Sequence, residues 1–196
     1  MQLVVYVNKK IMSLAHAIAT ILLQSPQTGY DLSKEFNEKV SCYWQATSQQ
    51  IYRELARMQE KEWVKVEILA QSVRPDKKIY SLTDVGRQEL ISWIAEPSQA
   101  TAIREDLLVK VRSGFIVSED ILISEIERRK QFHQQKLEYY RSSEVEFGDL
   151  DQLSRPQRHI YLTLRCGIRY ETMWIEWCDE AIASLLIQKK VNNKQN

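Results

Sequence analysis

The chain has 196 residues and a mass of 23.1 kDa, which is room for one domain or two small ones. Its 27 Lys and Arg residues against 26 Asp and Glu residues leave a formal net charge of +1, so no global field attracts nucleic acid or an acidic membrane. With 44% apolar residues, 5 Gly and 4 Pro, the composition excludes disordered and collagen-like chains.

The start of the sequence predicts an arm and two short helices. Residues 3–7 are rich in β-branched side chains, so we expect residues 1–11 to form an extended N-terminal arm. In residues 13–23 apolar side chains recur at helical spacing before a proline closes the segment. Thr28 is suited to be the N-cap of a second helix. The expected apolar face of that helix consists of Leu32, Phe36 and Val40.

A third helix is predicted to begin after Thr47. Thr47 and Gln50 have the spacing of a capping box, in which each side chain bonds to the other residue's backbone N–H. The expected inner face of the helix is Ile51, Leu55 and Met58. The remaining positions make an outward face that is polar, basic and aromatic; they are Ser48, Gln49, Tyr52, Arg53, Ala56 and Arg57.

Two strands and a fourth helix follow. Residues 64–68 alternate apolar and charged side chains, as a half-buried strand does, and residues 78–82 form the second strand of the predicted hairpin. The connector 70–77 gives this hairpin a basic tip. Thr83 is expected to cap the fourth helix. We expect Leu90, Ile91 and Ile94 to be its inward residues.

The order of three helices, a hairpin and a helix is that of a winged helix-turn-helix, which we place at residues 12–96. A major groove about 12 Å wide admits one helix, here the third, and the wing follows the adjacent backbone. This segment holds ten Lys and Arg against eleven Asp and Glu, so attraction to DNA must be local. Gln49 and Tyr52 are expected nearest the bases. The full set of expected DNA-binding residues is Ser48, Gln49, Tyr52, Arg53, Arg57, Arg74, Lys77 and Lys78.

The second half, after a break at residues 96–100, predicts a helical dimerisation domain at 104–188. Its helical patterns are 104–113, 118–141 and 154–188, with an acidic linker at 142–151 before the last. The middle pattern carries a thin apolar stripe that is expected to meet one partner; its residues are Leu122, Ile126, His133, Leu137 and Tyr140. The last helix has two apolar faces, and burying them gives on the order of 10 kcal/mol, so we expect a second copy to cover them. We expect Gly167 to mark a close crossing of two subunits. The expected dimerisation residues are Leu164, Gly167, Ile168, Tyr170, Trp174, Trp177, Ile182 and Leu185.

Three segments of the first half resemble the PadR family of bacterial transcriptional regulators. They are 29–32 (GYDL), 50–55 (QIYREL) and, most specifically, 74–87 (RPDKKIYSLTDVGR). The resemblance implies a homodimeric repressor or activator whose third helix enters the groove, with a helical C-terminal region that pairs two subunits. Glu62 stands where such proteins commonly carry a glycine, which leaves open the conformation of this helix-to-strand turn.

Other classes of function find little support in the sequence. Cys42, Cys166 and Cys178 are an odd number at wide spacings, typical of reduced thiols in the cytoplasm. No apolar stretch reaches the roughly 20 residues of a membrane span, and no signal peptide is recognised. No catalytic motif, metal-ligand spacing or cofactor-binding loop is present either. We therefore expect a cytoplasmic protein that is not an enzyme and uses no metal or cofactor.

The interpretation is thus a protein that binds double-stranded DNA at a pseudo-palindromic operator as a homodimer, with mainly α structure and a two-stranded β-wing. We regard a repressor as the first hypothesis. Aromatic residues of the last helix permit a small aromatic effector; they are Tyr161, Tyr170, Trp174 and Trp177. The alternative is a protein-interaction module whose winged helix docks another protein, which the near-neutral charge permits.

Overall fold

The computed structural model describes residues 14–40, 43–70, 76–98, 100 and 103–192, and the side chains up to Lys189. The predicted N-terminal arm, Cys42 and Arg74 lie outside the described residues. The chain divides into two compact units, residues 1–100 and 101–196, which are described separately below.

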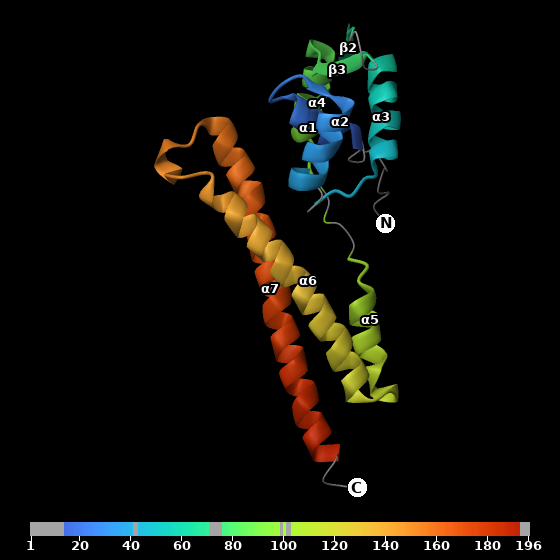
Figure 1. The fold of residues 1–196 in the computed structure, drawn as a ribbon, viewed down its shortest axis with the longest axis vertical. Coiled ribbons are helices and arrows are strands. Elements are labelled where there is room, and N and C mark those ends of the chain that lie inside the picture. Colours follow the sequence, from blue (N-terminus) through green and yellow to red (C-terminus); the bar gives the residue numbers. More distant parts are fainter. Residues whose placement is uncertain (1–13, 41–42, 71–75, 99, 101–102, 193–196) are drawn as a thin grey trace, which may run out of the picture. The chain divides into compact units, whose positions relative to one another are not determined.

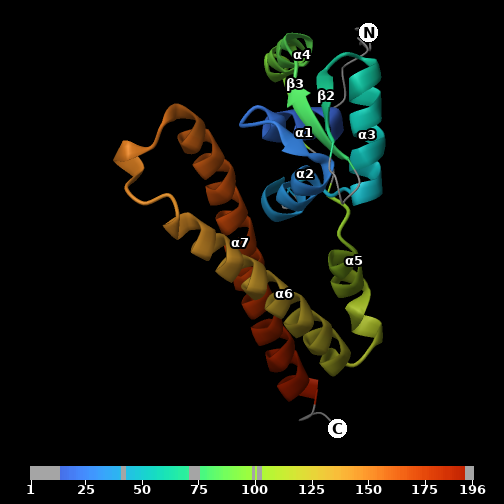
Figure 2. The ribbon, with the colours of Figure 1, turned by 45° about the horizontal axis from the view of Figure 1, so that its top comes forward.

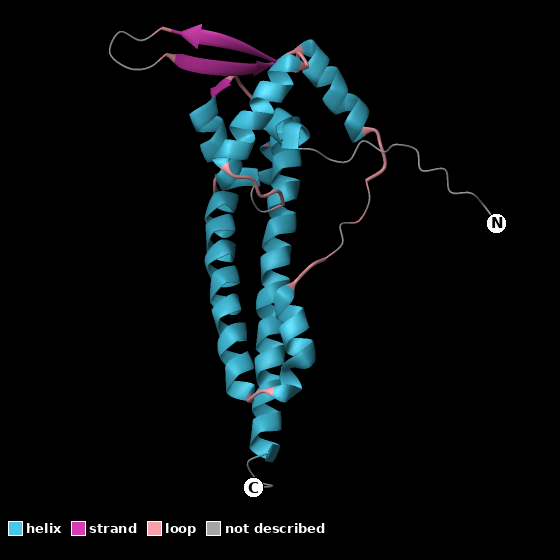
Figure 3. Cartoon of the chain, turned by 90° about the vertical axis from the view of Figure 1, so that its right-hand side faces the viewer, coloured by secondary structure: helices cyan, strands magenta, loops and turns pink. Residues whose placement is uncertain are grey.

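The first unit is a winged helix-turn-helix with a three-stranded antiparallel sheet (Figure 1). Its elements are α1 (Leu14–Leu22), β1 (Gln27–Thr28), α2 (Gly29–Glu35), the π-helix η1 (Phe36–Val40), α3 (Ser48–Glu60), β2 (Val64–Leu69), β3 (Lys77–Leu82) and α4 (Asp84–Ile94). The strand order is β1-β3-β2, and the β2–β3 register runs from Val64 opposite Leu82 to Leu69 opposite Lys77. Figure 3 shows β2 and β3 as a hairpin. The two-stranded prediction missed β1, which pairs Gln27 with Tyr80.

The core of this unit is one continuous apolar cluster. The predicted inner faces of α2 and α3 are confirmed; their residues are Leu32, Phe36, Val40, Ile51, Leu55 and Met58, each at most 3% exposed. They pack with the buried residues of α1. The apolar faces of α1, α2 and α3 are thus buried against one another within this unit.

The inward face predicted for α4 is wrong in two of three positions. Leu90 is buried, but Ile91 and Ile94 are 53% and 65% exposed. Trp93 turns inward in their place because its ring stacks on the buried ring of His16, with centroids 4.6 Å apart. In β2, Ile68 is likewise exposed, because the end of the hairpin extends beyond the core.

The turn between α3 and β2 keeps the conformation that a glycine favours. Glu62 has a φ of 58°, and no other non-glycine residue among those described has a positive φ. Its neighbours fix this turn: the Trp63 N–H donates to the Met58 carbonyl at 2.8 Å, and the Thr83 hydroxyl donates to the Glu62 carbonyl at 2.6 Å. The turn therefore has the left-handed conformation although its residue is a glutamate, and Glu62 has the unfavourable backbone energy of that conformation.

The second unit is a long helical hairpin with a short helix beside it. Its elements are α5 (Asp106–Ser113), the 3-10 helix η2 (Gly114–Ile116), α6 (Glu119–Val145), the 3-10 helix η3 (Leu150–Gln152) and α7 (Arg155–Asn192). Helices α6 and α7 lie side by side (Figures 1 and 2). Helix α6 continues to Val145, so the predicted linker at 142–151 begins later than expected. None of the described helices has the length and hydropathy needed to cross a membrane.

The core of the helical unit is thin and includes polar groups. The predicted stripe of α6 is confirmed; its residues are Leu122, Ile126, His133, Leu137 and Tyr140, all buried. Nδ1 of His133 bonds to the carboxylate of Glu171, and both side chains are 4% exposed. The sequence reasoning did not anticipate this pair, since its partners are 38 residues apart.

Candidate nucleic-acid interface and the helical unit

The third helix begins as its sequence predicts. The Thr47 side chain accepts from the Gln50 N–H at 3.2 Å, and the Gln50 side chain accepts from the Thr47 N–H at 2.8 Å. This capping box fixes where α3 starts and therefore which side chains face outward. The predicted outward residues are all exposed; they are Ser48, Gln49, Tyr52, Arg53, Ala56 and Arg57.

Helix α3 is held against α2 by a polar contact as well as by its apolar face. The Ser33 hydroxyl donates to the Ser48 hydroxyl at 2.7 Å, so the first turn of α3 is tied to the middle of α2. Arg57 lies at the other end of the outward face, where it pairs with Glu54 at 3.2 Å. This exposed pair is weak and leaves the guanidinium available to a stronger anion such as a phosphate.

The wing supplies further cations beside α3. Lys77 and Lys78 begin β3 and are exposed, while Tyr80 two residues further on is buried. Within the described part of the chain, Arg53, Lys77 and Lys78 make no ion pair. Three unpaired cations on one side of an otherwise neutral unit are local positive charge of the kind that phosphates need.

A groove of about 650 Å³ lies between the start of α2, the side of α3 and the start of β3. Its lining residues are Thr28, Gly29, Tyr30, Asp31, Tyr52, Asp76, Lys77, Lys78 and Tyr80. The structure thus brings the predicted residues Tyr52, Lys77 and Lys78 together. Burial and, second, the nearby Tyr52 raise the pKa of Tyr80, which therefore stays protonated.

The sequence analysis missed Tyr30 as a candidate site residue. Its side chain is 72% exposed and lines the same groove as Tyr52. Its position in the segment 29–32, directly after the N-cap Thr28, could have indicated it, because residues at a helix start lie where the backbone N–H groups are exposed.

In the helical unit, the predicted dimerisation residues fall into two groups. Tyr170 is exposed, and Trp177 is partly exposed. The other residues are buried or partly buried within the chain itself. Ile168 and Trp174 are buried, whereas Leu164, Ile182 and Leu185 are partly buried.

Two of those residues are in contact with α6 of the same chain. Trp174 is 6% exposed because the chain itself covers it: the His133 ring stacks on it at 5.1 Å, and the Arg129 guanidinium lies 5.8 Å from the ring centroid. Gly167 lies against α6 of the same chain, since a Cβ there would lie 3.2 Å from the Tyr140 ring.

One apolar stripe of α7 stays uncovered. It consists of Leu162, Cys166, Tyr170, Met173 and Trp177, spaced i, i+4, i+8, i+11 and i+15, which is one helix face. Four of the five are exposed. Cys178 lies outside this stripe, in the core with Leu107, Ile126 and Trp174, and burial raises the pKa of its thiol.

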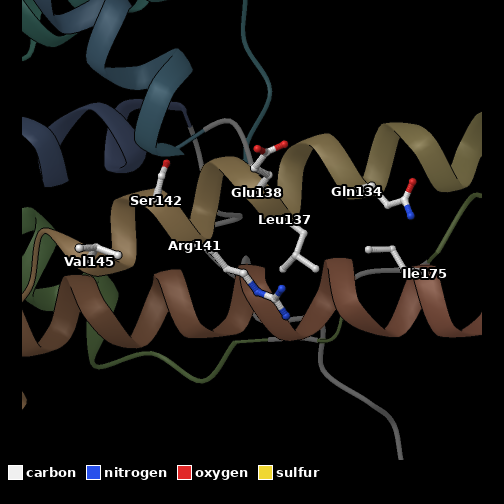
Figure 4. A pocket seen from close by; sticks show the side chains of 7 residues that line it. All are labelled: Gln134, Leu137, Glu138, Arg141, Ser142, Val145 and Ile175. Carbon is white, nitrogen blue, oxygen red and sulfur yellow. The ribbon is translucent and has the colours of Figure 1, made fainter.

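A hollow between α6 and α7 adds a second incomplete surface. It is lined by Gln134, Leu137, Glu138, Arg141, Ser142, Val145 and Ile175. Leu137 and Arg141 reach from α6 toward α7, and Ile175 reaches back (Figure 4). Apolar side chains stand here beside charges of both signs, which is the composition of a surface that a second copy can cover.

The described residues hold no cluster of metal-binding side chains. No group of three or more His, Cys, Asp or Glu side chains there could hold a metal ion. His16 lies between the Trp63 and Trp93 rings of the first unit, and His133 lies in the core of the second.

Comparisons with known proteins match both units. Residues 18–92 match the model of the transcriptional regulator PadR-like family, and residues 103–185 match that of the virulence activator alpha C-terminal region. A probable transcriptional regulator of Mycobacterium tuberculosis, Rv1176c, is 36% identical over 190 residues, which cover 91% of this chain and all of that one.

Two solved structures share the fold over most of the chain. The Vibrio cholerae virulence activator AphA is 29% identical with a TM-score of 0.72, covering 90% of this chain and 99% of its own. Bacillus subtilis PadR in complex with operator DNA is 24% identical with a TM-score of 0.77, covering 88% and 98%. The same protein in complex with p-coumaric acid has a TM-score of 0.71, at 24% identity and the same coverage.

Proposed function

Because this chain belongs to the PadR-like family of transcriptional regulators, which are not enzymes, we propose that it binds a pseudo-palindromic operator as a homodimer. In this proposal residues 12–96 contact DNA and residues 104–188 pair the subunits. The observation that supports it is that Tyr52, from the outward face of α3, lines one groove with the wing residues Lys77 and Lys78. The operator complex of the structural relative PadR supports the same partner.

The residues divide by chemistry into two roles. Gln49 and Tyr52 stand where α3 would meet base edges, and Ser48 stands beside them at the helix start. The cations would contact phosphates, which position the protein without reading sequence. They are Arg53, Arg57, Arg74, Lys77 and Lys78.

The apolar stripe of α7 is the surface we assign to a second copy. A stripe of five residues along one helix suits an isologous pair, in which the same patch meets itself. The hollow beside Arg141 and Glu138 extends this surface with charges of both signs. Binding to an inverted repeat on one face of the duplex would require two α3 helices about 34–36 Å apart, one turn of the duplex.

The salt dependence of binding tests the phosphate contacts. Each phosphate contact adds roughly −0.9 to the slope of log affinity against log salt. Replacing both Arg74 and Lys77 by Ala should flatten the slope by about 2 per wing, with the dimer intact in sedimentation. Lys136→Ala, a cation of α6, is the control and should leave the slope unchanged. An unchanged slope in the double variant would remove the wing from the interface.

We further propose repression as the sign of regulation, following the negative transcriptional regulator PadR of Bacillus subtilis, which is 25% identical over 177 residues. A promoter that carries the selected operator, fused to a reporter, should lose expression when the protein is present. Increased expression would show an activator. If no promoter fragment shifts at low salt while another protein co-purifies in fixed stoichiometry, the winged helix docks protein instead.

A small aromatic effector is the third part of the proposal, supported by the p-coumaric acid complex of the structural relative. The effector must bind the DNA-competent and incompetent states with different affinity, since only that difference shifts their populations. Of the predicted aromatic residues, Trp174 is packed in the core, which leaves Tyr161, Tyr170 and Trp177 to meet a ligand. Aromatic acids that change neither the melting temperature nor DNA affinity would refute this part.

A further inference from the structure

Gly29, the first residue of α2, is buried under the ring of Tyr52 from α3. A Cβ built on Gly29 would lie 3.1 Å from Cζ and 3.2 Å from the hydroxyl oxygen of Tyr52, and closer still to Cε1. These distances are below ordinary van der Waals contact, so the ring can occupy its place only because residue 29 has no side chain.

The backbone itself does not require glycine here. Among the described glycines only Gly148 has a positive φ, so Gly29 adopts a conformation open to any residue. At the first turn of a helix, Ala is a better helix former than Gly. The requirement therefore comes from Tyr52 alone.

Tyr52 also lines the groove, together with Tyr80 and the lysines at the start of β3. The ring is nonetheless 46% exposed, so a displaced ring has solvent to move into and the fold need not fail.

We propose that Gly29 is a positioning residue for operator recognition: it holds the Tyr52 ring in one orientation between α2 and the wing, so that Tyr52 meets the DNA already ordered. This inference rests on the proposed function, in which Tyr52 contacts the operator. A side chain fixed before binding loses less conformational freedom on association, which favours both affinity and a defined base preference.

A double-mutant cycle tests the coupling, with a duplex enriched by the wild-type protein from random-sequence DNA as the probe. Gly29→Ala should weaken binding to this duplex by about tenfold, the scale of one lost specific contact. It should also broaden the preference at the base pair next to Tyr52 in a repeated selection. In a Tyr52→Ala background, Gly29→Ala should have no further effect, because the ring it displaces is gone.

Gly114→Ala is the matched control. Its Cβ would press on Leu122 of α6, 3.0 Å from Cγ, so it has the same kind of steric conflict away from the groove. It should lower the melting temperature at least as much as Gly29→Ala while leaving the base preference unchanged. Equal losses from Gly29→Ala with and without Tyr52 would overturn the inference, and so would an unchanged affinity. Failure of the wild-type protein to enrich any duplex would instead refute the proposed function.

Discussion

The two units of this chain differ in how completely they bury their apolar side chains. The winged helix closes an apolar core, with Ile18, Leu32 and Phe36 fully buried, and turns a polar and basic face outward. The helical unit buries an ionisable pair in a thin core and leaves an apolar stripe outside. A unit that is complete in itself can present charge to a nucleic acid, whereas one that is incomplete favours a second copy.

The largest effect we predict lies in the core of the helical unit. His133→Ala should lower its free energy of unfolding by about 3–5 kcal/mol, because Glu171 stays buried without its partner. Denaturant unfolding followed by circular dichroism measures the loss. Gln131→Ala, an exposed position of α6 outside the hollow, is the control. Replacing both His133 and Glu171 by Leu should recover most of the stability; a loss equal to the control would show that the pair is unimportant.

The second largest effect that we predict is on self-association through the apolar stripe of α7. Met173→Glu should weaken self-association by about 1.5–3 kcal/mol, the value of one large apolar side chain that no longer becomes buried. Analytical ultracentrifugation over a dilution series measures it. Ala183→Glu, an exposed change on α7 outside the stripe, should leave the dimer as it is. If both variants associate like the wild type, α7 does not pair the subunits.

In the winged helix, Glu62 offers a smaller change of opposite sign. Glu62→Gly should stabilise this unit by about 0.5–1 kcal/mol, because it relieves a φ of 58° at the turn before β2. Lys61→Gly is the matched control and should destabilise, since Lys61 has a φ of −87° that needs no glycine. The two shifts in thermal midpoint should therefore differ in sign, and shifts of the same sign would exclude strain at Glu62.

The smallest effect concerns surface charge on α6. Hydrogen bonds from Arg128, at 2.8 Å, and then from Lys110, at 3.2 Å, lower the pKa of Glu125 from 4.5 to about 2. A lowered pKa stabilises the fold above pH 4.5, and this contribution is lost as pH falls toward 2. Glu125→Gln should flatten the pH dependence of unfolding in that window only slightly, because the site is exposed. A difference in stability between the variant and the wild type that is larger in acid than at neutral pH would contradict this.

Local patterns in the sequence were sufficient to predict most of the helices and strands of the winged helix-turn-helix. The Thr47–Gln50 capping box and the spacing of Ile51, Leu55 and Met58 act within one helix, so sequence distance and spatial distance coincide. The α6 stripe was predictable for the same reason.

What the sequence could not indicate depends on contacts between distant segments. Trp93 displaces Ile91 and Ile94 from the core because it meets His16, which lies 77 positions earlier in the chain. Trp174 is covered by His133, so apolar spacing alone could not show which face of α7 meets α6 and which stays exposed. The candidate DNA residues were predictable as an outward face, but the groove that joins Tyr52 to Tyr30 and the wing required the fold.

Selection of duplexes from random-sequence DNA, followed by measurement of the mass of the bound complex, tests the central claim most directly. We predict one enriched inverted repeat, with half-sites one helical turn apart, bound by two copies of the chain. Enrichment of a single half-site bound by one copy, or no enrichment at all, would contradict the division of labour between a DNA-reading unit and a pairing unit.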